Sequence, residues 1–237
     1  MATFLAQIKA LTSLDLGASS TPNQDEITQF LRDGVMDVTL KHLSIRPQDK
    51  EQFTRISGEV TSNGSEKVAR ASILSVVRES GTDNDWRNCR EISVGQQSNV
   101  TDTNSLHYAS KYNPAYMVAE DGAISVFPAA SSDPDAFKVY YINNDPRGDD
   151  DNSVAHGTSG LAFFPKDKVY LVVIYAAIKS LEAKLASYTI DEEDEELVRA
   201  LQVSLQQLQV TYNSGFLPDK NYEAALQSQS QQRGQRA

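Results

Sequence analysis

The sequence predicts an α+β protein, in which a helical bundle with a long antiparallel αα-hairpin carries a central, antiparallel β-rich insert. Three observations predict this fold class. Apolar residues recur at helical spacing towards both ends of the chain, strand-like runs with turn signals occupy residues 54–142, and two apolar stripes follow one another closely between residues 166 and 213. One domain is therefore expected over residues 1–215, followed by an extended, partly disordered C-terminal arm over residues 216–237.

Two helices are expected before the insert. Residues 2–11 place their apolar side chains on one side, which predicts a short first helix. A second helix is expected over residues 24–43, because apolar residues continue at helical spacing from Ile27 to Val38.

Local signals mark the start and the middle of the second helix. Thr21 is expected to cap it, with Pro22 at the first helical position and Gln24 returning the capping-box hydrogen bond. Gly34 lies inside the helix, where glycine costs roughly 1 kcal/mol relative to alanine. It either marks a close contact with another helix or is simply tolerated.

Turn signals organise the β-rich insert. Asn63-Gly64 lies between two strand-like runs and Asp121-Gly122 lies between two more, so two β-hairpins are expected. A further strand is expected at residues 137–142, a short one at residues 91–95, and one helical turn around residues 105–111.

The two longest helices are expected at residues 166–188 and 191–213. Each carries a single apolar stripe, with spacings that alternate between three and four residues. Because so few residues separate the two helices, their stripes are expected to pack together as an antiparallel αα-hairpin. A capping box at residues 189–192 is expected to open the second helix, and the acidic run that follows favours the positive end of the helix dipole.

Composition excludes several classes of protein. The chain has 237 residues, of which 40% are hydrophobic, so a sizeable core can form. Its net charge of −10 disfavours wrapping of nucleic acid, because such binding depends on Lys and Arg neutralising phosphates. Cys89 is the only cysteine, which excludes an intrachain disulfide. No apolar run is long enough to span a membrane and no secretion signal is recognised, so the expected setting is the cytoplasm of the producing cell or a particle assembled there.

Reactive residues are too scattered to predict an active site. His42, His107 and His156 lie far apart in the sequence and show no metal-ligand spacing. Residues 157–160 (GTSG) are one residue short of a nucleophile elbow. Cys89 lies near two arginines that could lower its pKa, although a structural cysteine is the more common outcome. No catalytic residue, no cofactor and no enzyme activity are expected.

The acidic loop at residues 145–152 is the one cluster that resembles a metal site in sequence. Carboxylates on a loop can hold Ca²⁺, but the EF-hand template fails here. Counted from Asp149, the position that needs Gly holds Val154 and the position that needs Glu holds Gly160. A solvated loop is therefore favoured over an ion site, and no metal ligand is predicted.

The last predicted helix and the arm after it are candidates for a partner interface. The free face of the helix is polar but uncharged, which suits a hydrated contact between proteins. Large apolar residues in the arm could anchor it on a partner. The alternatives are a helix that serves only the internal core and a frayed terminus. The free face carries Gln202, Gln206, Gln207 and Gln209. The predicted interface residues are Gln202, Gln206, Gln209, Phe216, Leu217 and Tyr222.

Three stretches carry a resemblance to known proteins. They are residues 23–34 (NQDEITQFLRDG), residues 104–116 (NSLHYASKYNPAY) with 122–128 (GAISVFP), and residues 164–166 (FPK) leading into 169–181 (VYLVVIYAAIKSL). Together they resemble virion structural proteins of marine and cyanobacterial tailed phages, and are similar to the head-to-tail adaptor, or neck, class. The resemblance covers most of residues 1–215.

The resemblance implies a non-enzymatic subunit of a ring of twelve copies. Such a ring docks under the portal protein, extends the DNA channel and presents a surface to the next neck or tail protein. DNA would pass through without specific binding, which is compatible with the acidity of the chain. The expected location is the head–tail junction of the virion, after synthesis in the host cytoplasm, and no membrane is involved.

Two other functions remain open. Within the particle, the protein could be a tail terminator or another tail-associated structural protein. From a different class, the β-rich insert could form a ligand- or glycan-binding module, since aromatic side chains often line such sites. The aromatic residues considered for that site are Tyr116, Phe127, Phe137, Tyr140 and Tyr141.

Overall fold

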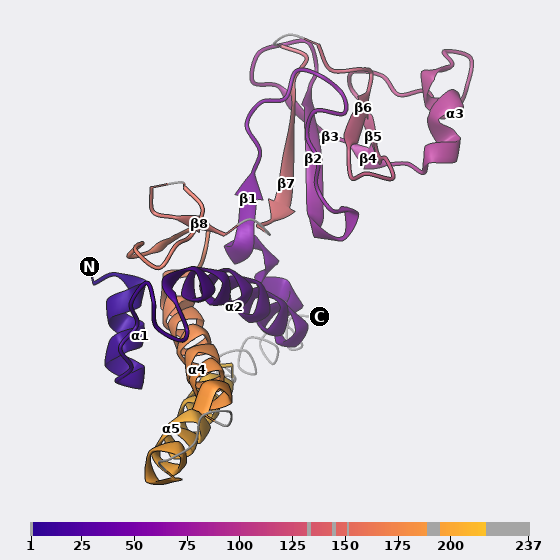
Figure 1. Cartoon of the computed structure of the whole chain (residues 1–237). Coiled ribbons are helices and arrows are strands. Elements are labelled where there is room, and N and C mark those ends of the chain that lie inside the picture. The colour runs from indigo at the N-terminus through magenta and orange to yellow at the C-terminus, as the bar shows by residue number, and fades with distance from the viewer. Residues whose placement is uncertain (1, 132–133, 144–145, 151, 189–194, 217–237) are drawn as a thin grey trace, which may run out of the picture. The chain divides into compact units, whose positions relative to one another are not determined.

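The computed structural model shows a mixed α+β protein (Figure 1). It describes the chain except residues 1, 132–133, 144–145, 151, 189–194 and 217–237. The chain divides into two compact units: Met1–Gln48 with Pro146–Ala237 form unit 1, and Asp49–Asp145 form unit 2. The β-rich insert expected at residues 54–142 lies within unit 2, whereas the single domain expected over residues 1–215 stays a prediction. The arm from residue 217 onward lies outside the described residues.

Unit 1 contains the long helices. Their bounds are α1 (Phe4–Thr12), α2 (Gln24–Ile45), α4 (Val169–Tyr188) and α5 (Glu195–Ser214), with the 3₁₀ turn η4 (Lys166–Lys168) before α4. Strand β8 (Arg147–Gly148) forms a short antiparallel pair with β9 (Leu161–Ala162). Each of the four helices predicted for this unit is present, and the predicted capping box at residues 189–192 lies outside the described residues.

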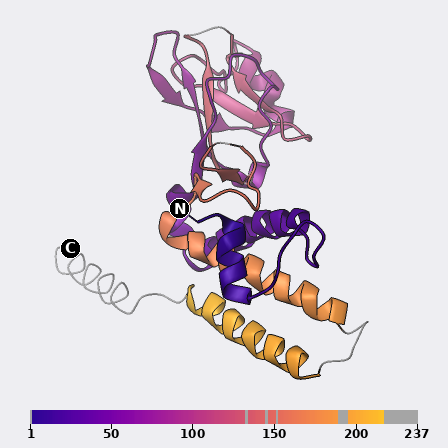
Figure 2. The same cartoon turned by 60° about the vertical axis from the view of Figure 1, so that its left-hand side comes forward.

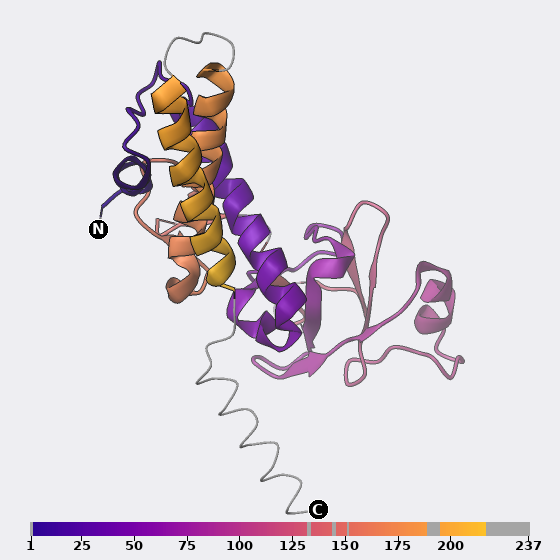
Figure 3. The same ribbon diagram turned by 90° about the horizontal axis from the view of Figure 1, so that it is seen from below.

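Helix α4 is the centre of unit 1. Helices α1, α2 and α5 all pack against it (Figure 2), and Figure 3 shows α5 running alongside α4. The prediction of a single apolar stripe on α4 was wrong, because residues on every side of the helix between Leu171 and Leu181 are buried. A helix that is covered by three neighbours must be apolar around most of its circumference.

Helix α2 begins at Gln24, as expected, but its capping residue differs from the expected one. Asn23, and not Thr21, caps the helix: its side chain accepts hydrogen bonds from the backbone N–H groups of Asp25 and Glu26, at 3.0 and 2.9 Å. The Glu26 carboxylate completes the capping box by accepting from the Asn23 N–H. The cap therefore lies two residues later than the Thr-Pro signal suggested.

Gly34 marks a close contact between two helices, which was one of the two alternatives. A Cβ atom at this position would lie 3.0 Å from Cδ1 of Tyr175 and 3.3 Å from Cγ1 of Val172, both on α4. The missing side chain lets α2 approach α4 closely, and this contact offsets the low helix propensity of glycine.

Unit 2 is built from two antiparallel-rich sheets. The first has the strand order β1-β7-β2-β3 and the second the order β4-β5-β6. The strands are β1 (Thr54–Ile56), β2 (Ile73–Glu79), β3 (Trp86–Asn88), β4 (Arg90–Glu91), β5 (Ala115–Val118), β6 (Ile124–Phe127) and β7 (Phe137–Ile142). The helical elements are η1 (Pro47–Phe53, which begins at the end of unit 1), η2 (Arg70–Ser72), η3 (Val94–Gln96) and α3 (Gln97–Thr101). The helical turn expected around residues 105–111 is therefore misplaced, since the helix lies earlier, at α3.

One of the two predicted hairpins is correct. Strands β5 and β6 pair antiparallel across the Asp121-Gly122 turn, with Val118 opposite Ile124. Gly122 adopts a φ of +81°, a conformation that favours glycine. The strand predicted at residues 137–142 is also present, as β7.

The hairpin predicted at Asn63-Gly64 was wrong. A turn exists there, but β1 and β2 do not pair with each other, because each pairs with β7 on opposite sides. The Asn63 side chain instead bonds the backbone of Val126 in β6, donating to its carbonyl at 2.9 Å and accepting from its N–H at 3.2 Å. The turn thus attaches this segment to the other sheet.

Candidate functional site

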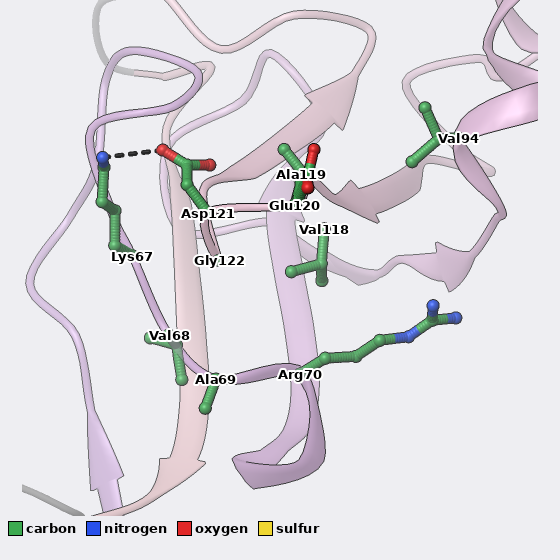
Figure 4. A pocket seen from close by; sticks show the side chains of 10 residues that line it. All are labelled: Lys67, Val68, Ala69, Arg70, Val94, Val118, Ala119, Glu120, Asp121 and Gly122. Atoms are coloured by element: carbon green, nitrogen blue, oxygen red, sulfur yellow. Dashed lines mark hydrogen bonds and ion pairs between the residues drawn. The ribbon is translucent and has the colours of Figure 1, made fainter.

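Two surface features are candidates for a functional site: a hollow in unit 2 and the exposed face of α5 in unit 1. The hollow has a volume of about 670 Å³ and is shown in Figure 4. It lies where the chain before β2 meets the β5–β6 hairpin. Its lining residues are Lys67, Val68, Ala69, Arg70, Val94, Val118, Ala119, Glu120, Asp121 and Gly122.

Backbone hydrogen bonds bring the two walls of the hollow together. The Val68 N–H donates to the Gly122 carbonyl at 3.0 Å, and Lys67 forms an isolated antiparallel bridge with Ala123. A Cβ atom on Gly122 would lie 3.1 Å from the Val68 carbonyl oxygen. Glycine at this position therefore serves both the turn and the close approach of the second wall.

Both cations that line the hollow are paired with carboxylates. Lys67 Nζ lies 2.7 Å from Asp121 Oδ2, and Arg70 Nη2 lies 2.6 Å from Glu91 Oε1. The hydrogen bond from Lys67 is the largest cause that lowers the pKa of Asp121, and the Ala123 N–H adds to it. With each cation held by a carboxylate and an apolar floor from Val68 and Val118, the hollow suits a small ligand with no large net charge.

The aromatic residues proposed for a binding module do not line this hollow. Tyr116, Phe127 and Phe137 are buried in the cores of unit 2, and Tyr141 packs against one of these cores. Alternation along the strands turns these side chains inward. The lysine, arginine and carboxylates that do line the hollow were missed, because no local sequence signal joins residues 67–70 to the β5–β6 turn.

Cys89 is a core residue and not a reactive one. Burial raises the pKa of its thiol to about 12. The structural cysteine favoured from the sequence is therefore confirmed, and the alternative of a pKa lowered by the neighbouring arginines is not: Arg87 pairs with Asp85 at 2.9 Å, and Arg90 donates to the His107 carbonyl. A thiol that stays protonated is a poor nucleophile.

The three histidines do not converge on a site. His156 is held as a structural group: its N–H donates to Thr28 Oγ1 at 3.1 Å, and its carbonyl accepts from the Leu5 N–H at 2.9 Å. These bonds join the loop before β9 to α1 and α2. Within the part of the chain that the structure describes, no group of three His, Cys, Asp or Glu side chains could hold a metal ion.

The acidic loop at residues 145–152 is used for local structure where it is described. Asp150 accepts hydrogen bonds from the side chain and the backbone of Asn152, which lower its pKa. Asp149 lies over Gly160, so close that a Cβ atom there would be 2.0 Å from Asp149 Oδ2. Asp145 and Asp151 lie outside the described residues.

One face of α5 is buried against the other helices of unit 1, as predicted. Leu201 and Tyr212 are buried, while Val198, Leu205 and Leu208 are half-buried. The Tyr212 hydroxyl donates to Asp37 Oδ2 on α2 at 2.5 Å, and Lys41 Nζ lies 4.6 Å from the centre of the tyrosine ring. Burial and this hydrogen bond both raise the pKa of Tyr212.

The opposite face of α5 is exposed. Gln202, Gln206, Gln207 and Gln209, which were predicted as a free face, are all exposed. Gln209 also lines a smaller hollow of about 240 Å³ beside Lys41 and Tyr175. Val203 and Val210 were missed by the sequence analysis, although they are 64% and 70% exposed. Their spacing of seven residues, off the main apolar stripe, is the signal that could have found them.

The predicted arm anchors are only partly visible. Phe216 is buried, and its ring lies 5.1 Å from that of Tyr212 in an edge-on contact, so this side chain serves unit 1 itself. Leu217 and Tyr222 lie outside the described residues.

The chain matches no model of a protein family, and its sequence matches no curated protein. Among the described helices, none is long and apolar enough to cross a membrane.

Proposed function

We propose that the chain is a non-enzymatic structural subunit of a tailed-phage neck. In this proposal it belongs to a head-to-tail adaptor ring that docks under the portal, extends the DNA channel and joins it to the tail. Twelve copies and the position in the neck come from the sequence resemblance. The four helices of unit 1, with α4 and α5 as an antiparallel αα-hairpin, would form the helical bundle of this subunit.

The observation that carries the proposal is the exposed face of α5. This face has no charged side chain from Ala200 to Ser214, in a chain of net charge −10. It exposes two valines among glutamines, whereas a helix face that only meets water is usually rich in charge. An uncharged face with apolar side chains is suited to a partner, and an assembly subunit needs such faces.

The acidity of the chain agrees with the proposed place in the particle. A channel wall of net negative charge repels DNA phosphates, so DNA can pass without being held. Acidic proteins with quite different functions share this property, which is why it supports the proposal without carrying it.

Immunogold electron microscopy on virions of the encoding phage tests the proposal. The antibody should recognise residues 227–237 or a segment that the structure shows to be exposed. We expect label at the head–tail junction. Label along the tail or at its end would replace the adaptor by a tail terminator or another tail-associated protein. No label on intact and on disrupted particles would overturn the virion assignment.

A ligand- or glycan-binding module is the second candidate, and the hollow in unit 2 is the observation that favours it. Its paired charges and apolar floor could hold a small polar ligand. Glycan-array and calorimetric titration of the full chain test this candidate. Saturable binding that is lost in Arg70→Ala would support it, whereas absence of binding would leave the assembly subunit.

A further inference from the structure

The exposed face of α5 has an internal pseudo-symmetry. Read forward from the middle of the helix, between Gln206 and Gln207, the residues are Gln, Leu, Gln, Val, Thr and Tyr. Read backward from the same point, they are Gln, Leu, Ser, Val, Gln and Leu. The sequence is therefore close to a palindrome over residues 201–212, and each exposed residue has a similar residue at the mirrored position.

A palindromic helix face is complementary to itself. If a second copy of α5 lies antiparallel on this face, Val203 of each helix lies opposite Val210 of the other. The pair therefore has two valine–valine contacts. Gln206 then meets Gln207 at the centre, where two primary amides can exchange hydrogen bonds. A two-fold interface requires that one patch fits its own copy, and this pattern meets that requirement.

From this pattern we infer that α5 pairs antiparallel with α5 of a second copy of the chain, about a two-fold axis between Gln206 and Gln207. The inference rests on the proposed function in one respect, since it takes the exposed face of α5 to be a partner surface. The inference also names the partner: before the protein joins a larger assembly, a second copy of the chain covers this face. An isologous contact closes at two copies, so a ring would need other surfaces of the subunit.

Charge favours the antiparallel direction. In the sequence, residues 191–196 are six consecutive acids, of which Glu195 and Glu196 open α5, whereas residues 200–214 carry no charge. In an antiparallel pair the two Glu195 residues would lie about 35 Å apart, at 1.5 Å per residue. In a parallel pair the two Glu195 residues would lie side by side, about 10 Å apart, where their repulsion is only partly screened.

The expected contact is small. A helix of twenty residues is about 30 Å long and offers a strip about 10 Å wide, or roughly 300 Å² on each partner. Stable complexes bury about 800 Å² on each partner, so this dimer should be weak and depend on protein concentration. Weak pairing is compatible with later replacement of the second copy by another component of the particle.

Sedimentation velocity of the full chain, over roughly 1 to 200 µM, measures the pairing, and four forms of the protein decide its geometry. They are the wild type, V203E/V210E, V203K/V210K and V203K/V210E. Both positions are exposed, so the variants should fold, and circular dichroism checks that they do. The two like-charge variants change the net charge of the chain in opposite directions. If both lose the dimer, the cause is repulsion at the contact and not the net charge of the protein.

We expect the wild type to be a monomer in equilibrium with a dimer. Both like-charge variants should be monomeric over the range, because equal charges would face each other at both contacts. The mixed variant V203K/V210E should pair at least about tenfold more tightly than either, since antiparallel pairing places each lysine opposite a glutamate. Added salt should weaken the mixed variant and strengthen the like-charge ones.

Two results would overturn the inference: a wild type that stays monomeric, or a mixed variant that behaves as the like-charge ones do. The particle labelling experiment is independent of this one. A monomer in solution whose label appears at the head–tail junction overturns the dimer and keeps the neck subunit. A protein that dimerises in solution but is absent from particles keeps the dimer and overturns the neck subunit.

Discussion

The Tyr212 hydroxyl should contribute measurably to the stability of unit 1. It donates to Asp37 Oδ2 at 2.5 Å, and the same carboxylate lies 3.0 Å from Lys41 Nζ. Hydrogen bonds to charged groups are worth about 1.5–3 kcal/mol. The Asp37 side chain is 31% exposed and keeps its lysine partner, so the lower end applies. Tyr212→Phe should therefore reduce the free energy of unfolding by about 1.5 kcal/mol at pH 7.

Tyr212→Ala separates the hydroxyl from the ring. The ring is buried between Tyr175, at 5.9 Å between ring centres, and Phe216, at 5.1 Å. Removal of a buried aromatic side chain costs about 3–5 kcal/mol, so the alanine variant should be destabilised by more than twice as much as the phenylalanine variant. Urea unfolding followed by far-ultraviolet circular dichroism measures both values, because the long helices lie in unit 1.

The pH dependence of this difference gives a sharper test. The pKa of Tyr212 is raised above its ordinary value of 10.0 by burial and by the bond to Asp37. Above pH 10 the unfolded chain loses the phenol proton while the folded chain keeps it, so wild-type stability falls by about 1.4 kcal/mol per pH unit. Tyr212→Phe lacks this group. The gap between the two proteins should therefore shrink to near zero by about pH 11.

Two outcomes would refute this reasoning. A Tyr212→Phe variant that equals the wild type at pH 7 would mean that the hydroxyl contributes nothing. A gap that stays constant or widens between pH 9 and pH 11 would mean that the phenol is not held protonated in the folded protein.

Three further predictions concern caps, turns and the thiol. Asn23→Ala should cost about 1 kcal/mol in urea unfolding, because it removes the cap of α2, whereas Thr21→Ala should cost little; equal effects would contradict the assignment of the cap. In the same urea unfolding, Gly122→Ala should lower the free energy of unfolding more than Gly64→Ala, since both have a positive φ but only a Cβ atom on Gly122 would meet a carbonyl oxygen, at 3.1 Å. The reverse order would show that the backbone at Val68 moves away from the added methyl group at little cost. Cys89 should react with a disulfide reagent at pH 8 much more slowly in the native protein than in urea, because its pKa is raised to about 12; fast native reaction would show that the thiol is accessible.

Helices and one hairpin were predictable because their signals are local. The helical periodicity placed α2 and α4 within a few residues, and the Asp121-Gly122 turn joins two strands that pair directly. The cap of α2 was misassigned because Thr21 and Asn23 both precede the helix and both can accept backbone hydrogen bonds. The hydrogen bonds that Asn23 accepts from Asp25 and Glu26 identify it as the cap, and they are seen only in the structure.

Pairings between distant segments were not predictable. Strand β7 lies between β1 and β2, so the Asn63-Gly64 turn has no hairpin to close. The walls of the hollow come from residues 67–70 and from the turn at Gly122, which meet through backbone hydrogen bonds that any sequence could make. Because these contacts are made by the backbone, they cannot be predicted from the pattern of side chains in the sequence.

By itself, the sequence determined the α+β class, the positions of the long helices, and the uncharged character of the last helix face. These follow from periodicity and composition, which depend on neighbouring residues along the chain. The tertiary structure alone decided that α4 is buried on every side between Leu171 and Leu181, that Cys89 and Phe216 belong to cores, and that Val203 and Val210 are exposed. Burial depends on which elements meet in space, and a residue's neighbours in sequence do not specify its neighbours in the fold.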